Sequence, residues 1–268
     1  PWLVNKMGFT EEAAPGVVPE YVKIAFGIGA MVFLISILYT VLKTKEYPPK
    51  DLETFKKEKK ENRFVHDFLF SLKNMPVTMK KLGLIQFFSW FAFFTMWSMA
   101  TPALTDYVYK APAPDKTAFD FSIPAQEQAF NIANKAFQTA SDNVGSAMGI
   151  YGLSSMVFAL LLTFYAAKRS VNRKLVHMFS LVAGGVGFLL MGLGQASLLN
   201  ISFILIGISW GSILSMPYAM LSSSVDEKRM GMMMGLFNMF IVIPQIIAAL
   251  GGINFLSELI SKSSIAPM

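Results

Sequence analysis

The fold is decided by stretches such as LNISFILIGISWGSILSMPYAML, residues 199–221, which contains no Asp, Glu, Lys or Arg. A helix of about 20 apolar residues crosses a hydrocarbon core ~30 Å thick, and one charged residue at its centre costs about 3 kcal/mol. Five other stretches are similarly apolar, and only the first of the six contains a charge, Lys23 at its edge. We predict transmembrane helices at 22–42, 82–105, 146–167, 175–195, 199–221 and 230–255.

The composition of the whole chain agrees with a membrane protein. Of 268 residues, 54% are hydrophobic and 15% are charged, whereas soluble domains contain about 25% charged residues. The chain has no cysteine, which excludes disulfides, thiolate nucleophiles and Cys-ligated metal sites. Neither His66 nor His177 has a carboxylate or a second histidine beside it within a span. We therefore expect an all-α, polytopic transmembrane helix bundle without enzymatic activity, cofactor or metal site.

Lysine and arginine are unevenly divided among the connecting segments. Residues 43–81 contain 11 of them, and 168–174 and 228–229 are also basic, whereas 106–145 has three lysines against five acidic residues. Because basic loops are retained on the cytoplasmic side, the alternation places the basic segments inside and both ends of the chain outside. The net charge of +6 is explained by this retention, so we expect no nucleic-acid partner.

The long basic segment suggests the domain organisation. We expect an outer loop and one helix at 1–43, a cytoplasmic linker at 44–81, and five further spans at 82–268. The Lys/Glu-rich run 44–62 is typical of a solvated linker. After it, a short predicted helix that ends before Pro76 has an apolar face, which is typical of a helix in the membrane interface. That face consists of Phe64, Val65, Phe68, Leu69 and Leu72.

Glycine and proline suggest how the spans pack and bend. Glycines four residues apart allow helix backbones to approach closely in lipid, and three such pairs occur: Gly145 and Gly149, Gly207 and Gly211, Gly231 and Gly235. Prolines within the spans, Pro217 and Pro244, predict bends.

The outer connection is predicted to become helical at Ser122 and Pro124. Phe130, Ala133 and Phe137 give this helix an apolar stripe. The stripe is expected to pack on the outer ends of the spans, with a lid over a binding cavity as the alternative.

Amide side chains share helix faces with aromatic residues. Gln86, Trp90 and Trp97 are spaced at i, i+4 and i+11, and Asn238 and Gln245 are seven apart. An amide in hydrocarbon needs a hydrogen-bond partner, which a wet cavity or a neighbouring helix supplies. Amides beside flat aromatic rings suit a neutral polyol, so we predict a ligand cavity. Structural hydrogen bonds between helices are the alternative.

Several stretches resemble a known family. Residues 212–221, 229–238 and 241–245 are similar to the tenth and eleventh helices of sucrose-transporter-like proteins. These are sugar:proton symporters of the major facilitator superfamily, related to the glycoside–pentoside–hexuronide:cation symporters. Residues 86–91 resemble the start of their seventh helix, and 44–49 the end of the sixth. The basic turn 168–174 resembles the superfamily's basic hairpin, with Asn172 in the position of a glycine.

The resemblance covers nearly the whole chain and implies twelve helices in two halves, alternating access and a sugar cavity between the halves. It also implies that the chain is a fragment with helix six, the central linker and helices seven to eleven, whose partner is a missing N-terminal half. Proton-coupled symport needs a carboxylate in the membrane, and the spans contain none. The coupling acid is therefore expected in the missing half.

We expect a secondary active transporter of the cell inner membrane that imports a neutral disaccharide or oligosaccharide together with protons. The expected cavity residues are Gln86, Trp90, Trp97, Tyr151, Trp210, Tyr218, Asn238 and Gln245; the resemblance supplies Tyr151, Trp210 and Tyr218. A cytoplasmic gate is expected from Arg169, Arg173, Lys174 and Arg229.

Two alternatives remain for the transport function. A facilitator superfamily efflux pump for amphipathic compounds would use the many Met and Phe residues as an apolar pocket. A six-span permease subunit of an ATP-driven transporter would dock an ATPase through residues 63–72.

Overall fold

The chain is seen in a computed structural model that describes residues 7–8, 18–45, 64–226 and 229–260. Within these residues every regular element is a helix. Six helical segments are long and apolar enough to cross a membrane: Glu20–Lys43, Val77–Val108, Pro124–Ala166, Arg173–Gly192, Ala196–Ser222 and Met230–Leu256. The predicted all-α bundle with six spans is confirmed.

The chain divides into two compact units, residues 1–64 and 65–268. The first unit contains the apolar helix α2 (Glu20–Lys43), in which no residue is buried. Residues 46–63 of the expected linker lie outside the described part of the chain, as do 1–6, 9–17 and 261–268.

The second unit begins with two helices that precede the outer connection. Helix α4 (Phe64–Lys73) is followed by α5 (Val77–Ala103), which continues into a π-helical turn, η1 (Leu104–Val108). The remaining helices are α6 (Pro124–Ala166), α7 (Arg173–Gly192), α8 (Leu199–Ser222), α9 (Met230–Ile247) and α10 (Ile253–Ile260). Short helical turns are η2 (Lys116–Ala118), η3 (Ala196–Leu198) and the π-helical η5 (Ala248–Gly252).

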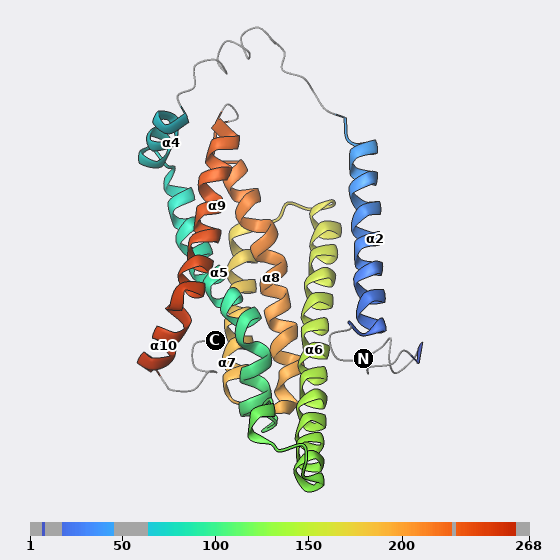
Figure 1. The fold of residues 1–268 in the computed structure, drawn as a ribbon. Helices are drawn as coiled ribbons and strands as arrows, with labels where there is room; N and C mark the ends of the chain where they lie inside the picture. The colour runs from blue at the N-terminus through green and yellow to red at the C-terminus, as the bar shows by residue number, and fades with distance from the viewer. Residues whose placement is uncertain (1–6, 9–17, 46–63, 227–228, 261–268) are drawn as a thin grey trace. The chain divides into compact units, whose positions relative to one another are not determined.

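Helix α8 lies at the centre of the second unit, where it packs extensively against α7 and α6, while α5 packs against α9 (Figure 1). The buried side chains form two clusters along the bundle. One is rich in aromatic residues and includes Phe93 and Phe203. The other is rich in methionine and includes Met79, Met216 and Met233. The sequence positions on α5 place the methionine-rich cluster toward the predicted cytoplasmic end.

Close helix packing at the Gly207 and Gly211 pair is confirmed. A Cβ added to Gly207 would lie 2.4 Å from the Tyr151 carbonyl oxygen of α6, and one added to Gly211 would lie 2.9 Å from the Phe158 ring. On α7, Gly184 makes a similar approach to Ser209 of α8, at 2.4 Å.

The other two glycine pairs make no such contact. A Cβ built on Gly145, Gly149, Gly231 or Gly235 would meet no atom of the described residues within 4 Å. For these two pairs, the expectation of close packing finds no partner helix in the part of the chain that the structure describes.

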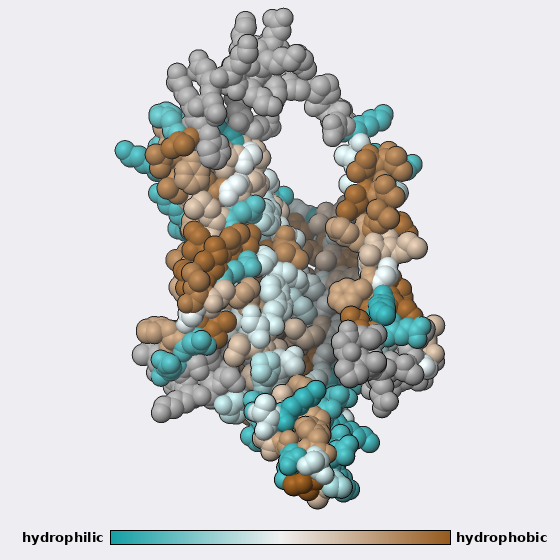
Figure 2. All heavy atoms as spheres, in the orientation of Figure 1, coloured by the Kyte–Doolittle hydropathy of each residue, from teal (hydrophilic) through white to brown (hydrophobic). Residues whose placement is uncertain are grey.

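Helix α6 is one continuous helix, whereas the hydropathy pattern predicts an outer helix from Pro124 and a separate span at 146–167. It begins at Pro124, as the proline predicts, and its 43 residues run without interruption to Ala166. At 1.5 Å per residue this is about 64 Å, twice the thickness of a hydrocarbon core. Its N-terminal end therefore projects beyond the other helices of the second unit (Figure 1), and hydrophilic residues gather on this projecting part (Figure 2).

One residue of the apolar stripe, Phe130, packs against the loop that precedes α6. The ring centroids of Phe119 and Phe121 lie 5.5 and 5.1 Å from that of Phe130, which is buried. Phe130 thus packs locally against the preceding loop. Helix α6 also contacts η1 at the outer end of α5, and packing of the whole stripe on the outer ends of the spans stays a prediction.

Neither Pro217 nor Pro244 interrupts its helix, and the bends predicted at these residues stay predictions. Helix α8 continues through Pro217 to Ser222, and α9 continues through Pro244 to Ile247. The break after α9 occurs in η5, where Gly251 has a φ of 113° that glycine adopts without strain.

Candidate functional site

Three tryptophans from two helices meet in one cluster. Trp90 and Trp97 lie on one face of α5, and Trp210 comes from α8. The ring centroid of Trp210 is 5.1 Å from that of Trp90 and 4.9 Å from that of Trp97, in edge-to-face arrangements. Such pairs contribute about 0.5–1.5 kcal/mol beyond the area they bury.

Phe93 lies at the centre of this aromatic cluster. It is one turn from Trp90 on α5 and fully buried, and its ring centroid is 5.1 Å from that of Trp210. Tyr151 of α6 and Phe188 of α7 approach the same ring at 6.3 and 5.6 Å. Four helices therefore meet at Phe93. Phe93 and Phe188 are not among the expected cavity residues because both are apolar, although the i+3 spacing of Phe93 from Trp90 indicates a shared helix face.

Three buried polar atoms in this region have no hydrogen-bond partner among the described residues. They are Gln86 Oε1, Trp90 Nε1 and the Tyr151 hydroxyl. Gln86 is fully buried, and its Nε2 donates only a long hydrogen bond of 3.5 Å to the Ile213 carbonyl of α8. A buried polar group left without a partner costs about 1–3 kcal/mol, so three in one place require an explanation.

Tyr218 and Asn238 form a second group, which joins α8 to α9. The Tyr218 hydroxyl donates a hydrogen bond of 2.8 Å to Asn238 Oδ1, and its ring lies 5.6 Å from that of Phe237. Asn238 is exposed although it lies within a span. Tyr218 and Phe237 belong to the methionine-rich cluster, so this pair is separate from the tryptophans.

Gln245 joins neither group. Its Nε2 donates a hydrogen bond of 2.9 Å to the Ile241 carbonyl of its own helix. The eight expected cavity residues are therefore arranged as five in the aromatic region, two in the α8–α9 pair and one that is satisfied locally.

A cavity of about 520 Å³ lies elsewhere, between α5, α7 and α8. Apolar side chains such as Ile85 and Val182 line it, together with Lys81, Lys174 and the buried His177. His177 Nδ1 is 2.9 Å from the Ser212 hydroxyl of α8. None of the eight expected cavity residues lines this space.

The four basic residues expected at the gate lie near helix ends on the predicted cytoplasmic side. The Arg173 guanidinium donates to the Ala219 carbonyl near the end of α8. The Arg229 guanidinium lies 4.6 Å from the centroid of the Phe70 ring of α4. Lys174 lines the cavity, and Arg169 is exposed. Within the described residues, none of the four forms an ion pair with a carboxylate.

The outer connection contains two carboxylates that hold tight turns. Asp115 accepts hydrogen bonds from the Thr117 amide at 2.9 Å and hydroxyl at 2.8 Å, which lower its pKa. Asp120 accepts from the Ser122 hydroxyl at 2.6 Å and amide at 2.9 Å, which lower its pKa likewise. Across the described ranges, no group of three or more His, Asp or Glu residues could hold a metal ion.

Comparison with known families decides the class of protein. The sequence model of the Major Facilitator Superfamily matches residues 14–249, most of the chain. The chain belongs to the Major Facilitator Superfamily. No curated protein and no solved structure gave a match.

Membership in this superfamily makes the chain a multi-pass membrane protein of a transporter family. It agrees with the superfamily part of the resemblance and disfavours the permease subunit of an ATP-driven transporter. The sugar symporter and the efflux pump remain as hypotheses for what this facilitator transports.

Proposed function

We propose that this facilitator binds a neutral sugar at the aromatic region of α5, α6 and α8 and imports it with protons. The observation that carries the proposal is the grouping of unpartnered polar atoms on Gln86, Trp90 and Tyr151 beside the three tryptophans. The resemblance to sucrose-transporter-like proteins supports a disaccharide or oligosaccharide, taken up across the cell inner membrane.

The hydrogen-bonding capacity of these atoms matches that of hydroxyl groups. The Trp90 N–H donates, Gln86 Oε1 accepts, and the Tyr151 hydroxyl does both. A polyol offers donors and acceptors together, so it can satisfy all three atoms and remove their desolvation penalty. The C–H faces of a sugar ring pack well on indole. The apolar stretches 82–105, 146–167 and 199–221, which form this region, contain no Asp, Glu, Lys or Arg, which favours a neutral ligand.

The rings now pack on one another, so binding requires them to separate. In a two-state transporter this corresponds to a conformation in which the site is closed, and the ligand stabilises the open one through its contacts with the same side chains. Under this proposal, Arg169, Arg173, Lys174 and Arg229 form the cytoplasmic gate. The proton carrier is proposed to lie outside the six apolar stretches, because they contain no Asp or Glu.

The efflux of amphipathic compounds is favoured by a different observation. Methionines dominate the second cluster, including Met79, Met216, Met220 and Met233, and their flexible side chains adapt to varied apolar ligands. Under this alternative, hydrophobic dyes bind in place of sugars.

Tryptophan fluorescence tests the proposal on the whole chain in lipid nanodiscs. A panel of disaccharides should quench the emission in a saturable manner, whereas hydrophobic dyes without spectral overlap should not. Trp90→Phe retains an aromatic ring but removes the N–H, and should weaken binding about fivefold because one hydrogen bond contributes about 1 kcal/mol. Phe88→Leu is the control, because Phe88 is an exposed residue of the same helix.

Two further outcomes define the site. Equal sugar affinity for Trp90→Phe and Phe88→Leu would remove the aromatic region from the site. Asn238→Ala and Gln245→Ala address the α9 residues through sugar uptake by the full transporter. Unchanged uptake would exclude them from sugar binding, and the Tyr218–Asn238 and Gln245–Ile241 hydrogen bonds would then be purely structural.

A further inference from the structure

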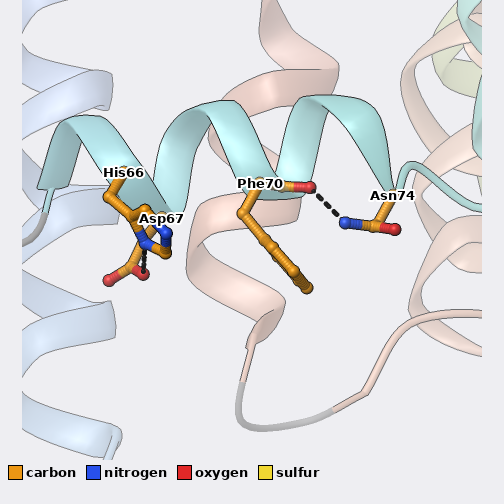
Figure 3. A network of polar contacts seen from close by, with 4 residues as sticks. All are labelled: His66, Asp67, Phe70 and Asn74. Atoms are coloured by element: carbon orange, nitrogen blue, oxygen red, sulfur yellow. Dashed lines mark hydrogen bonds and ion pairs between the residues drawn. The ribbon is translucent and has the colours of Figure 1, made fainter.

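Helix α4 has one face that packs against the bundle. It ends three residues before α5 begins at Val77. Ser71 and Met75 are buried, and Phe68 packs against the methionine-rich cluster. On another face, His66 Nδ1 lies 3.4 Å from the Asp67 carboxylate, and the Asn74 amide donates to the Phe70 carbonyl at 2.9 Å (Figure 3). The helix is therefore held in place on one side and polar on another.

A third face of α4 is apolar and uncovered. Val65, Leu69 and Leu72 are 69%, 56% and 43% exposed. Their i, i+4 and i+7 spacing places them in one stripe, on the side of the helix opposite Asp67. The residues therefore form a continuous apolar surface.

The position of α4 along the chain identifies what covers this stripe. Three residues reach at most about 11 Å, so α4 cannot lie far from the point where α5 enters the bilayer. Helices of this kind lie in the interface with their apolar face buried about 5–10 Å below the headgroups. Lys73, Lys80 and Lys81 are exposed near the same boundary, where lysine is attracted to the anionic cytoplasmic leaflet.

We propose that α4 is a lipid-anchored brace: Val65, Leu69 and Leu72 insert into the cytoplasmic leaflet, and the Arg229–Phe70 contact connects this anchor to the inner end of α9. The Arg229 guanidinium lies 4.6 Å from the Phe70 ring centroid, and α9 starts at the next residue, Met230. A cation over the face of an aromatic ring is attracted by the negative charge density of that face, so the contact favours this position of Arg229. The leaflet thereby restrains the inner end of α9.

The absence of cysteine from the chain allows a direct test. Leu69→Cys and the matched control Asp67→Cys would each carry a nitroxide label, in the full chain reconstituted in phosphatidylcholine vesicles with one third phosphatidylglycerol. Collision rates with oxygen, which partitions into lipid, and with a water-soluble nickel chelate are then measured by electron paramagnetic resonance. We expect a several-fold higher oxygen-to-nickel ratio at position 69 than at position 67.

Two outcomes would overturn the anchor. A nickel collision rate at position 69 equal to that at 67 would place the stripe in water. Low collision rates with both reagents at 69 would show that protein covers it. Val65→Cys and Leu72→Cys provide independent positions with Asn74→Cys as their control, so the test does not depend on the folding of one variant.

The Arg229–Phe70 contact between α4 and the inner end of α9 is tested by a separate measurement, the mobility of a label on α4. Arg229→Gln should increase the mobility of a label on Asp67→Cys several-fold while leaving the oxygen-to-nickel ratio of the Leu69→Cys label high. Lys168→Gln removes a positive charge from an exposed site outside the proposed gate and should change neither quantity. Unchanged mobility in Arg229→Gln, or equal changes in both variants, would contradict the brace.

Discussion

Helices α8 and α9 carry the same features but are packed differently. Each has a pair of glycines four residues apart and a proline further along. In α8, Gly207 and Gly211 touch α6, so a methyl group at either position would collide with it. In α9, Gly231 and Gly235 face no atom of the described residues within 4 Å. The spacing allows close packing, but a neighbouring helix is needed to produce it.

The amide side chains that contact α8 from α5 and from α9 also differ in their burial. Gln86 is fully buried and reaches the backbone of α8, whereas Asn238 of α9 is exposed and held only by Tyr218. Gly231, Gly235, Asn238 and Val242 are all exposed on one face of α9. We call this the open face of α9. An exposed amide inside a span indicates a face that meets a protein partner or water during function.

The largest expected difference between α8 and α9 is the loss of stability when a side chain is truncated to alanine. Phe203→Ala in α8 removes a fully buried ring and should lower the free energy of unfolding by about 3–5 kcal/mol. Val242→Ala on the open face should change it by less than about 0.5 kcal/mol. Thermal unfolding of the purified chain in one detergent measures both. Similar losses for the two variants would show that the open face is covered.

Replacing a glycine by alanine is expected to change the free energy of unfolding in opposite directions in the two helices. Gly207→Ala places a methyl group 2.4 Å from the Tyr151 carbonyl oxygen and should destabilise the chain by about 1–3 kcal/mol. Gly235→Ala should stabilise it by up to about 1 kcal/mol, because alanine favours the helix and no atom obstructs it. The same unfolding assay applies. Destabilisation by Gly235→Ala would indicate a helix packed against the open face.

The Tyr218–Asn238 hydrogen bond joins the two helices directly. Tyr218→Phe and Asn238→Ala should each cost about 1 kcal/mol, and the double variant should cost no more than about 1.5 kcal/mol. A double-mutant cycle of unfolding free energies measures the coupling between the two side chains. Additive losses would mean that the hydrogen bond contributes nothing to the α8–α9 contact.

The smallest effect is expected outside both helices, in the outer connection. Its hydrogen bonds lower the pKa of Asp115 and Asp120, so the ordered turns are stabilised above the pKa of the unfolded carboxyls. This stabilisation is lost as the pH falls through the lowered folded-state pKa. Hydrogen exchange of residues 115–123 should therefore lose protection at acid pH while α8 stays protected. Asp120→Asn should weaken the turn already at pH 7.

The predicted spans agree closely with the observed helices where hydropathy changes sharply. Residues 199–221 and 175–195 were expected, and α8 and α7 run over Leu199–Ser222 and Arg173–Gly192. Helix α6 was divided because its N-terminal half is polar, and hydropathy detects lipid contact and not helical continuity. None of its three glycines, Gly145, Gly149 and Gly152, interrupts it.

The candidate site was predictable in part. The shared face of Gln86, Trp90 and Trp97 follows from helical spacing, and the structure brings Trp210 and Tyr151 to the same region. The spacing of Asn238 and Gln245 gave no information about their partners. One bonds to another helix and the other to its own backbone. Periodicity identifies a face, but it does not identify what lies opposite.

Membrane insertion and the approximate position of the spans can be inferred from the residues alone, because the cost of placing a charge in hydrocarbon belongs to the individual residue. The tertiary structure alone decided that α8 is enclosed, that α9 keeps an open face and that four helices meet at Phe93. Packing is a property of pairs of surfaces from distant parts of the chain. Identical motifs on two helices can therefore have different neighbours.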